Sequence, residues 1–541
     1  MKKKYFLPNL IFICILILGC NNDDENLTAT PTPQNQKPGD FTIQITQITE
    51  NNALLSWDAA VDPDEDKVTY TVILGDNEVQ TNLETTEFLL EGLIAQTNYN
   101  GKVTASDGNG NTSENTFDFT TEEGEVIISE EVSIAWEKSF GGSQIDVANA
   151  IQLTVDGGYI VAGTANSDDG DVGGNNDADG YIGGDYWVIK LNNSGDMIWE
   201  TNIGGNSDEA GNSIQQTTDG GYIVVGFTDS NDQDISGDTS FADFWIVKLD
   251  GSGNLVWETN YGGSGNEEAT SVDQTLDGGY IVAGFTSSSN GDVGGNNGGI
   301  DYWVIKLDAE GALIWETNLG GSEFDIAQSV EQTSDGGYIV GGYSESLGDD
   351  VGGNYGEKDY WIVKLDALGN LIWETNLGGS LDDLAYDIHQ TTDQGYIVAG
   401  YSESSDFDVS DNNGKKDSWI VKLDTSGAIV WEVNLGSSES DAARSIQQTT
   451  DQGYIFAGNS GASDFDVSTN NGGYADYWVV KLNPLGGLSW EISFGGPEPD
   501  YANAIQQTND GYIVAGYVWG PGGDISGAGK GKWDYWIVKL E

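Results

Sequence analysis

The 541-residue chain contains two cysteines and one histidine, and these scarcities exclude several kinds of protein. Cys14 lies in an N-terminal apolar stretch that we expect to be removed, which leaves Cys20 as the only cysteine of the mature chain. A single cysteine forms no internal disulfide. A single histidine, His389, excludes a site built from several histidines and argues against a Ser-His-Asp triad.

Basic side chains are also scarce, with 20 Lys and Arg residues against 88 Asp and Glu residues and a formal net charge of -68. Such a surface repels nucleic acids and anionic lipids, so we expect neither to be recognised directly. It suits a soluble protein, expected to be a monomer, in an extracellular and cation-rich setting. An aromatic content of 11% is too high for a disordered chain and fits many short strands joined by tight turns.

The longest apolar stretch of the N-terminus, Leu10 to Leu18, is too short to span a membrane as a stable helix. It follows three lysines at positions 2–4 and therefore predicts an export signal over residues 1–19. The stretch ends in Ile-Leu-Gly-Cys20, which resembles the lipobox of bacterial lipoproteins. The resemblance implies that Cys20 is lipidated and anchors the protein to a membrane. An ordinary signal peptide with an incidental cysteine is the alternative.

The residues after Cys20 carry a short acidic run, Asp23-Asp24-Glu25. This run resembles the signal that directs lipoproteins of Bacteroidota to the outer face of the outer membrane, which implies a protein that faces the cell exterior. The alternative is a solvated acidic tether. Residues 20–39 include three prolines among Thr, Asn and Gln, a composition that predicts a flexible, semi-extended spacer.

Residues 40–122 alternate apolar and polar side chains between turns, a pattern typical of a small β-sandwich. Together, Trp57, Tyr70, Leu93 and Tyr99 make this stretch resemble a fibronectin type III domain, with Tyr99 placed as a tyrosine corner. The resemblance implies a spacer or a binding surface rather than an enzyme. Residues 123–132 then form a linker.

The rest of the chain is a repeat. The segment DGGYIVAG at Asp156 recurs six more times, with a first step of 63 residues and five steps of 58, and two tryptophan columns keep the same spacing. A fixed period of this kind indicates stacked units that share one core. Each unit has four strand-like runs, which predicts the blades of a β-propeller, because the rung of an open β-solenoid is normally much shorter.

The phase of the repeat predicts that the ring is closed. The region begins with a lone strand of the fourth type around Trp136 and ends on a strand of the third type at Glu541. Pairing these two strands removes both sheet edges. We therefore predict an all-β protein in which a fibronectin type III-like β-sandwich is followed by a seven-bladed β-propeller over residues 133–541.

An acidic residue begins the first strand of every unit, and a very small residue follows two positions later. Because the first strand of a propeller blade normally lines the central channel, these acids could ring one mouth of the channel. Alternatively, each acid bonds the adjacent Gly-Gly loop or a neighbouring blade. The seven candidate channel acids are Asp146, Glu209, Glu267, Asp325, Asp383, Asp441 and Asp500.

A second acidic column lies in the loop before each third strand, and a further Asp closes that loop. Two carboxylates with amide and backbone oxygens are ligands for a hard cation, so calcium is a candidate cofactor; Asx-turns that shape a surface loop are the alternative. The candidate ligands are Asp171, Asp234, Asp292, Asp350, Asp408, Asp466 and Asp524, closed by Asp185, Asp243, Asp301, Asp359, Asp417, Asp476 and Asp534. Asp62, Asp64 and Asp66 in the first domain could likewise hold calcium or form an acidic turn.

A lysine recurs in every third strand and a glutamate follows every fourth-strand tryptophan. We expect the two columns to pair between blades. Such pairs would contribute little each if they were exposed.

The turn formed by Leu365, Asp366, Gly369 and Trp373 resembles the repeats of quinoprotein propellers and, more loosely, the Asp boxes of sialidases. The whole repeat region resembles surface lipoproteins of Bacteroidota, some of which carry labels such as hydrolase or endoglucanase. The second tryptophan column and the lack of a cysteine pair depart from the quinoprotein pattern. Shared turns are structural, so the function does not follow from them.

Catalysis normally breaks repeat symmetry, and no carboxylate pair stands out for glycoside hydrolysis. We therefore interpret the protein as a non-catalytic binding or adhesion protein for a glycan or a protein ligand. A glycan-active hydrolase that uses propeller carboxylates and a structural envelope component are the alternatives.

The parts that differ between units indicate where a ligand would bind. His389 stands where other units have Gln, Asp or Glu, and the loop at Asn175–Gly184 is longer than its equivalents. The last unit carries Trp519 and Trp533 outside the two tryptophan columns, which makes these two residues the candidate ligand-binding side chains. Alternatively, both tryptophans cover the seam where the ring closes.

Overall fold

The computed structural model describes residues 35–49, 52–75, 77–90, 93, 97–121, 132–174, 184–236, 241–410, 412–470, 472, 474–527 and 530–541. Cys20, the export signal, most of the tether and residues 175–183 of the longer loop lie outside the described residues. The chain divides into two units, residues 1–127 and residues 128–541. Among the described residues no segment forms a helix that could cross a membrane.

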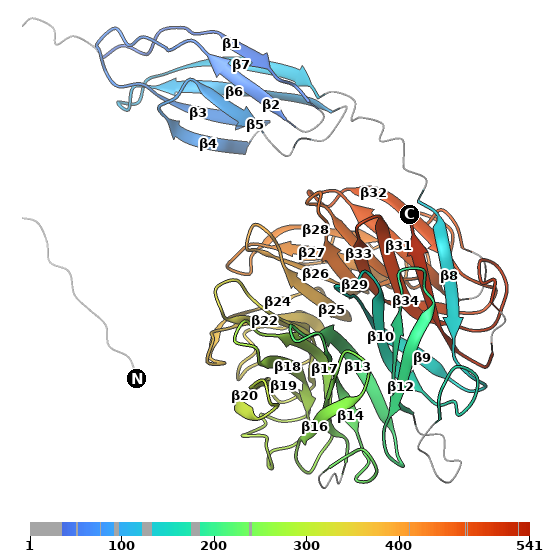
Figure 1. The fold of residues 1–541 in the computed structure, drawn as a ribbon. Helices are drawn as coiled ribbons and strands as arrows, with labels where there is room; N and C mark the ends of the chain where they lie inside the picture. The colour runs from blue at the N-terminus through green and yellow to red at the C-terminus, as the bar shows by residue number, and fades with distance from the viewer. Residues whose placement is uncertain are drawn as a thin grey trace, which may run out of the picture. The chain divides into compact units, whose positions relative to one another are not determined.

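The first unit is a β-sandwich of two antiparallel sheets (Figure 1). One sheet has the order β1 (Ile43–Thr46), β2 (Ala53–Trp57) and β5 (Glu87–Leu90). The other has the order β4 (Asn77–Leu83), β3 (Thr69–Leu74), β6 (Asn98–Ser106) and β7 (Thr112–Thr120).

The core of this sandwich contains the residues on which the sequence resemblance rests. Trp57, Tyr70 and Leu93 are buried, and the rings of Trp57 and Tyr70 lie 5.4 Å apart. The Tyr70 hydroxyl accepts a hydrogen bond from the Ala60 N–H at 2.8 Å. The three aspartates of the nearby loop form a turn, in which Asp62 accepts the N–H groups of Asp64 at 2.9 Å and Asp66 at 3.3 Å.

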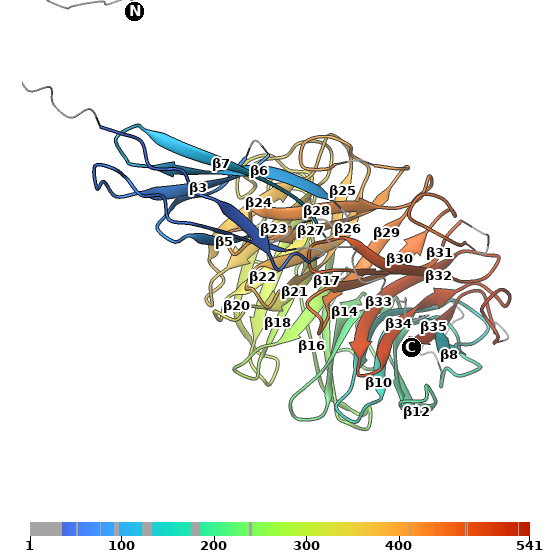
Figure 2. The same ribbon diagram turned by 90° about the horizontal axis from the view of Figure 1, so that it is seen from above.

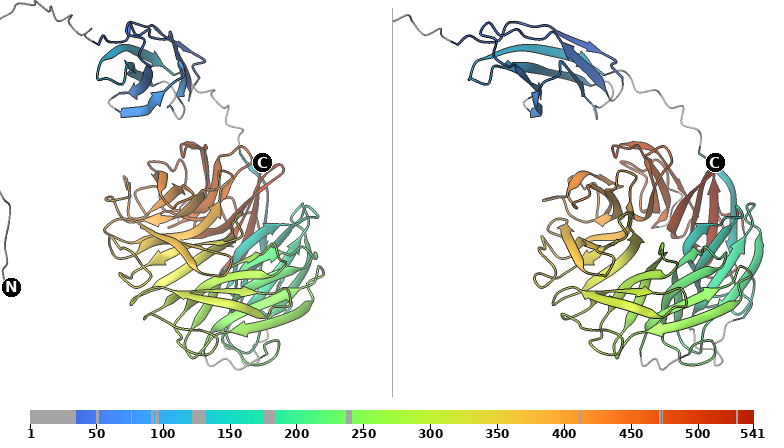
Figure 3. Two further views of the ribbon diagram at one scale, coloured as in Figure 1. Left: turned by 90° about the vertical axis from the view of Figure 1, so that its left-hand side faces the viewer. Right: turned by 60° about the vertical axis from the view of Figure 1, so that its left-hand side comes forward.

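The second unit contains seven four-stranded antiparallel sheets, which Figures 2 and 3 show side by side around a ring. We number the blades in chain order from the one that begins with β9. The first strands are β9 (Asp146–Leu153), β13 (Glu209–Gln216), β17 (Glu267–Gln274), β21 (Asp325–Gln332), β25 (Asp383–Gln390), β29 (Ala442–Gln448) and β33 (Asp500–Thr508). The second strands are β10 (Tyr159–Ala165), β14 (Tyr222–Thr228), β18 (Tyr280–Thr286), β22 (Tyr338–Ser344), β26 (Tyr396–Ser402), β30 (Tyr454–Ser460) and β34 (Gly511–Val518).

The outer two strands of each blade carry the two tryptophan columns. The third strands are β11 (Asp185–Leu191), β15 (Asp243–Leu249), β19 (Asp301–Leu307), β23 (Asp359–Leu365), β27 (Asp417–Leu423), β31 (Asp476–Leu482) and β35 (Asp534–Leu540). The fourth strands are β12 (Met197–Ile203), β16 (Leu255–Tyr261), β20 (Leu313–Leu319), β24 (Leu371–Leu377), β28 (Ile429–Leu435), β32 (Leu488–Phe494) and β8 (Ile134–Phe140). The predicted fold class, a fibronectin type III-like sandwich and a seven-bladed propeller, is confirmed.

Aromatic contacts join six of the seven blades to the next, whereas blade 5 has Ser418 at the position of the aromatic residue. The third-strand tryptophans are fully buried. In blade 4, the ring of Tyr360 lies 4.6 Å from the ring of Trp419 in blade 5, and the Tyr360 hydroxyl donates to the Trp419 carbonyl at 2.9 Å. The same contact joins Tyr186 to Trp245 and Tyr302 to Trp361. An aromatic pair of this kind contributes about 0.5–1.5 kcal/mol beyond the area that it buries.

The fourth-strand tryptophans explain the glycine of the repeated turn. A Cβ on Gly369, whose φ is +82°, would lie 2.8 Å from the ring of Trp315 in the preceding blade. Glycine therefore satisfies two requirements at this position, a left-handed backbone and a close approach to the ring.

The lysine and glutamate columns do not pair with each other, contrary to the sequence prediction. Each third-strand lysine instead binds the aspartate of the DGG turn in its own blade, as Lys364 binds Asp335 at 3.1 Å. Each glutamate accepts the indole N–H of the third-strand tryptophan of its own sheet, as Glu374 does from Trp361 at 3.0 Å. The spacing along the sequence identified both columns but not which strand lies beside which.

The ring closes through β8, as the phase of the repeat predicted. β8 pairs antiparallel with β35, with Trp136 opposite Lys539. The Ser133 N–H donates to the Glu541 carbonyl at 2.9 Å. The aromatic contact between blades also crosses the closure, since the Tyr535 hydroxyl donates to the Trp187 carbonyl at 3.0 Å.

Deletion of residues 133–142 tests the closure. The deletion removes β8, leaves β35 as an open edge and breaks the bond from Trp536 to Glu137. We expect the thermal unfolding of the propeller to lose its cooperativity or to shift to a lower temperature in calorimetry. A deletion of equal length in the tether, residues 24–33, is the control. An unchanged midpoint in the 133–142 deletion would contradict the closed ring.

Candidate functional site

The seven first-strand acids are buried within the blades. One oxygen of each carboxylate accepts the N–H of the second residue of the Gly-Gly loop four positions earlier, as Asp325 does from Gly321 at 2.7 Å and Asp383 from Gly379 at 2.6 Å. None of the seven is among the described residues that line the channel. Among the described residues these acids therefore bond the adjacent loops, the alternative given above, and do not line the channel. The buried acids are Asp146, Glu209, Glu267, Asp325, Asp383, Asp441 and Asp500.

Most of the candidate calcium ligands bond the first glycine of the same Gly-Gly loops. Asp292 donates its N–H to the Gly262 carbonyl at 2.9 Å, and its carboxylate accepts the Gly262 N–H at 3.3 Å. The same two-way contact is made by Asp171, Asp350, Asp408, Asp466 and Asp524. Within the described residues, no group of three or more His, Cys, Asp or Glu side chains is arranged to hold a metal ion. Calcium binding stays a prediction.

The loop-closing aspartates lie against the first-strand acids. A Cβ on Gly320 would be 2.4 Å from Asp301 Oδ1 and 2.7 Å from Asp325 Oδ2, so only glycine fits between the two carboxylates. The Oδ1 atoms of Asp301, Asp359 and Asp417 are buried without a hydrogen-bond partner. Burial, together with the neighbouring carboxylates, raises the pKa of each of these three aspartates to about 7.

These raised pKa values predict that stability falls as the pH rises. The unfolded chain releases the aspartate protons near pH 4, whereas the folded chain holds them to about pH 7. The folded state therefore binds more protons in this window, and the stability gained there is lost as the pH passes 7. We expect a higher melting temperature at pH 5.5 than at pH 8, because each such group loses up to about 1.4 kcal/mol of stabilisation per pH unit until the pH reaches about 7.

Asp359→Asn isolates one of these groups, because the amide keeps the shape of the side chain and cannot ionise. The variant should be more stable than the wild type at pH 8 and show a shallower dependence of melting temperature on pH. Asp168→Asn, at an exposed acid, is the control for the loss of one charge. The same pH dependence in wild type and Asp359→Asn would contradict the assignment.

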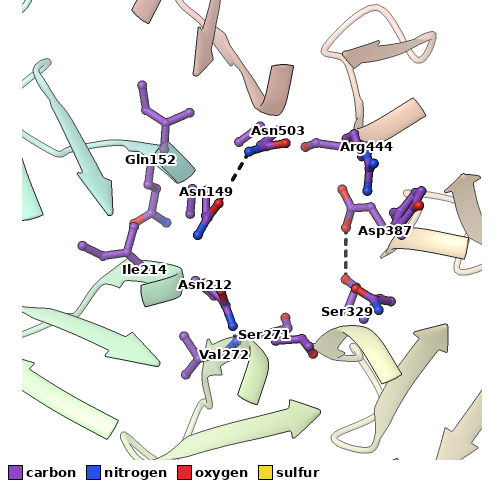
Figure 4. A pocket seen from close by; sticks show the side chains of 18 of the residues that line it. Asn149, Gln152, Asn212, Ile214, Ser271, Val272, Ser329, Asp387, Arg444 and Asn503 are labelled. Atoms are coloured by element: carbon purple, nitrogen blue, oxygen red, sulfur yellow. Dashed lines mark hydrogen bonds between the residues drawn. The ribbon is translucent and has the colours of Figure 1, made fainter. Parts of the chain in front are cut away.

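The channel is a cavity of about 570 Å³ lined by the first strands of all seven blades (Figure 4). A β-bulge follows the small residue of the first strand, as at Ala327, whose partner is Gly342, while Ser329 pairs with Gly341. The bulge interrupts the alternation of side chains between the two faces of the strand. Residues after the bulge, such as Ser329 and Glu331, therefore line the channel, whereas Asp325 lies in the blade interior.

A belt of hydrogen bonds runs around most of the channel. In it, the side chain four residues after the small residue accepts a backbone N–H from the first strand of the next blade. Asp273 accepts from Gln332 at 2.9 Å, and Glu331 accepts from Gln390 at 2.8 Å. The amide oxygens of Gln152, Gln215, Gln447 and Gln506 make the equivalent bonds.

The belt changes at His389, where blade 5 meets blade 6. His389 Nδ1 lies 3.2 Å from Glu331 Oε2, and its Nε2 lies 3.3 Å from Asp387 Oδ1. Asp387 bonds blade 6 by accepting the Ile446 N–H at 2.9 Å, a bond that Ser213, Ser271 and Ser445 make at the equivalent positions of other blades. Burial alone would lower the pKa of His389, but the two carboxylates outweigh it and raise the pKa well above its usual value. The ring is therefore an imidazolium at neutral pH with both nitrogens engaged.

The bulge positions next to this break carry two further unlike side chains, Tyr386 and Arg444. The guanidinium carbon of Arg444 lies 4.1 Å from the centroid of the Tyr386 ring, and both residues line the channel. Sequence reasoning missed this pair. A signal was present, because Arg444 is the only arginine of the chain and the other bulge positions hold Asn, Thr or Gln.

The two tryptophans singled out from the sequence lie together in blade 7. The rings of Trp519 and Trp533 are 5.7 Å apart, Tyr517 lies 5.0 Å from Trp533, and Tyr501 lies 5.3 Å from Tyr517. We call these four residues the blade 7 aromatic cluster. The Trp533 carbonyl accepts the Asp146 N–H at 2.8 Å and so joins blade 7 to blade 1, whereas the Trp519 side chain is 41% exposed. Trp533 thus supports the seam and Trp519 is accessible.

Comparisons with known proteins identify two parts of the chain. Residues 36–119 match the family model of the fibronectin type III domain, and residues 281–454 match the model described as arylsulfotransferase. The regulatory protein FlaEY of Caulobacter vibrioides is 29% identical over 214 residues, which cover 36% of this chain and 21% of that protein. The chain spans about a fifth of the length of the curated relatives it matches.

Two solved structures resemble the chain at low sequence identity. The endosialidase of phage phi92 has a TM-score of 0.39 at 8% identity, with 79% of this chain and 71% of that chain covered. Sqt1 from Chaetomium thermophilum has a TM-score of 0.36 at 13% identity, with 75% and 99% covered. The comparisons thus show a fibronectin type III domain in the first unit and an arylsulfotransferase-like stretch, from β18 to β30, within the propeller.

Proposed function

We propose that the protein is a lipid-anchored cell-surface protein whose propeller binds a glycan at the blade 7 aromatic cluster. The observation that carries the proposal is the exposed ring of Trp519, held against Trp533 by a cluster that no other blade repeats in the part of the propeller that the structure describes. An aromatic ring that is fixed before binding offers stacking area to a sugar at low entropic cost. In this proposal the lipid on Cys20 attaches the chain to the outer membrane, and the fibronectin type III domain acts as a spacer.

Catalysis in the channel is the second candidate, favoured by one observation: the arylsulfotransferase-like stretch contains both His389 and Arg444. Two features of the channel disfavour it. Both ring nitrogens of His389 face carboxylates, so the histidine has no free lone pair for nucleophilic or base catalysis. Asp273 and Glu331 accept backbone N–H groups of neighbouring blades, which gives these carboxylates a structural role. A purely structural role in the envelope would leave the exposure of Trp519 without a purpose.

Replacing the two tryptophans tests the proposed site. A glycan array first identifies the ligand of the wild-type protein, with and without calcium, and calorimetry measures its affinity. Trp519→Ala should weaken binding at least about tenfold, and Trp519→Ala with Trp533→Ala should abolish it, because aromatic anchors carry most of the energy at such sites. Circular dichroism checks the fold of each variant.

Tyr474→Ala is the matched control, since this aromatic side chain is 87% exposed and lies outside the cluster. A folded double variant that binds the glycan with wild-type affinity would remove the site from blade 7. The glycan recovered after long incubation with wild type should be unchanged. A shortened or modified glycan would favour the catalytic candidate.

The lipid anchor has a separate test. Cys20→Ala should leave the export signal uncut by lipoprotein signal peptidase and release the protein from the outer-membrane fraction, because no thiol remains to carry the lipid. Added protease should digest the wild-type protein on intact cells. Protection of the wild type would place it on the periplasmic side instead.

A further inference from the structure

Arg444 has no ion-pair or hydrogen-bond partner among the described residues. The guanidinium instead makes a cation–π contact with the ring of Tyr386. The chain has 88 acidic residues, and each third-strand lysine is paired with an aspartate, as are Lys138 and Lys530. A guanidinium that stays unpaired in so acidic a protein keeps all its N–H donors available to a ligand.

The guanidinium is also held in place at the channel wall. Tyr386 lies beneath it at 4.1 Å, and the ring of Tyr401 supports Tyr386 at 5.9 Å. Figure 4 shows Arg444 next to Asp387 and Asn503, at the edge of the cavity. Stacking on an aromatic ring fixes a guanidinium and reduces the entropy that it loses when it binds a partner.

We propose that Arg444 and Tyr386 form a subsite for the carboxylate of an acidic sugar. This proposal rests on the proposed glycan-binding function and specifies the class of glycan. A planar carboxylate matches the paired N–H groups of a guanidinium. Asp387, the nearest acid in Figure 4, is bound to His389 and to the Ile446 N–H, which limits its repulsion of an arriving anion.

The rest of the cavity carries amide and hydroxyl groups that suit the hydroxyls of a saccharide. Its other acids, Glu268, Asp273 and Glu331, accept hydrogen bonds from Asn212, Gln332 and Gln390. Asn149, Asn212 and Asn503 line it from blades 1, 2 and 7, and Ser271 and Ser329 line it from blades 3 and 4. Amide and hydroxyl groups can both donate to and accept from sugar hydroxyls.

The subsite lies within reach of the blade 7 aromatic cluster. Figure 4 shows Arg444 of blade 6 next to Asn503 of blade 7, and Asn503 follows Tyr501 of the cluster by two residues on β33. In the proposed complex one oligosaccharide stacks on Trp519 and places an acidic unit at Arg444. The aromatic cluster would supply stacking area, and Arg444 would select for charge.

A pair of matched ligands tests the subsite on the full-length protein. The probes are a tetrasaccharide of galacturonic acid and the same tetrasaccharide with its carboxylates methyl-esterified, measured by calorimetry at one salt concentration. Wild type should bind the acid roughly ten- to a hundredfold more tightly than the ester, the range expected for hydrogen bonds to a charged group. Arg444→Gln should abolish that preference and leave the affinity for the ester unchanged.

Further variants keep the outcome clear. Lys138→Gln removes one positive charge on the surface, away from the channel, and should keep the preference for the acid. Arg444→Lys keeps the charge without the paired N–H groups and should lose most of the preference. It also replaces Arg444→Gln if that variant does not fold. A preference for the acid that survives both Arg444 substitutions would overturn the subsite.

The failure of the subsite can be told apart from the failure of the proposed function. If the ester binds through Trp519 and the acid binds no more tightly, the function stands and the subsite is wrong. If neither tetrasaccharide nor any glycan on the array binds, both are wrong. A sulfated galactose tetrasaccharide that binds as tightly as the acid, and depends on Arg444 equally, would overturn the assignment to a carboxylate.

Discussion

The contact between a third-strand aromatic residue and the tryptophan of the next blade is the interaction on which the propeller depends. Each tryptophan is buried in its own sheet, and six of the seven lie against a third-strand ring from the preceding blade, as Trp419 lies against Tyr360. A blade alone would expose these faces to water, so no blade is stable without its neighbours. The pair of Tyr535 and Trp187 joins the last blade to the first, and the chain completes it only because β8 pairs with β35.

The same repetition explains why so acidic a chain offers few free carboxylates for function. Every junction between blades contains a first-strand acid and a loop-closing aspartate next to one glycine, as Asp325 and Asp301 lie next to Gly320. The Gly-Gly loops need acceptors for their N–H groups, and these acids provide them. Carboxylates that serve in seven equivalent junctions are part of the architecture. Function is then left to the side chains that differ between blades.

The sequence predicted the architecture well because period and phase are global properties. The tryptophan columns and the lone strand around Trp136 established the number of blades and the closure. The channel was harder to predict, because the bulge after Ala327 reverses which side chains face inward and leaves no mark in the pattern. For that reason the sequence left open whether Asp325 faces the channel or bonds the Gly-Gly loop, and Arg444, at the equivalent bulge, was missed. The acid that pairs with Lys364 was also hard to predict, because it depends on which strands are neighbours, and the spacing along the sequence does not give this.

The bulge explains why asymmetry is tolerated at the positions proposed to bind a ligand. A bulged residue is left out of the strand ladder, so its side chain can change without disturbing the pairing of its neighbours. In this chain the bulge column holds Asn, Thr and Gln in five blades and Tyr386 and Arg444 in the other two. The blade 7 aromatic cluster is similarly built on two loop residues and on strand ends, where packing between blades places fewer demands. A propeller can therefore keep the same pair of acids at all seven junctions and still present a single, unlike surface on one side of its channel.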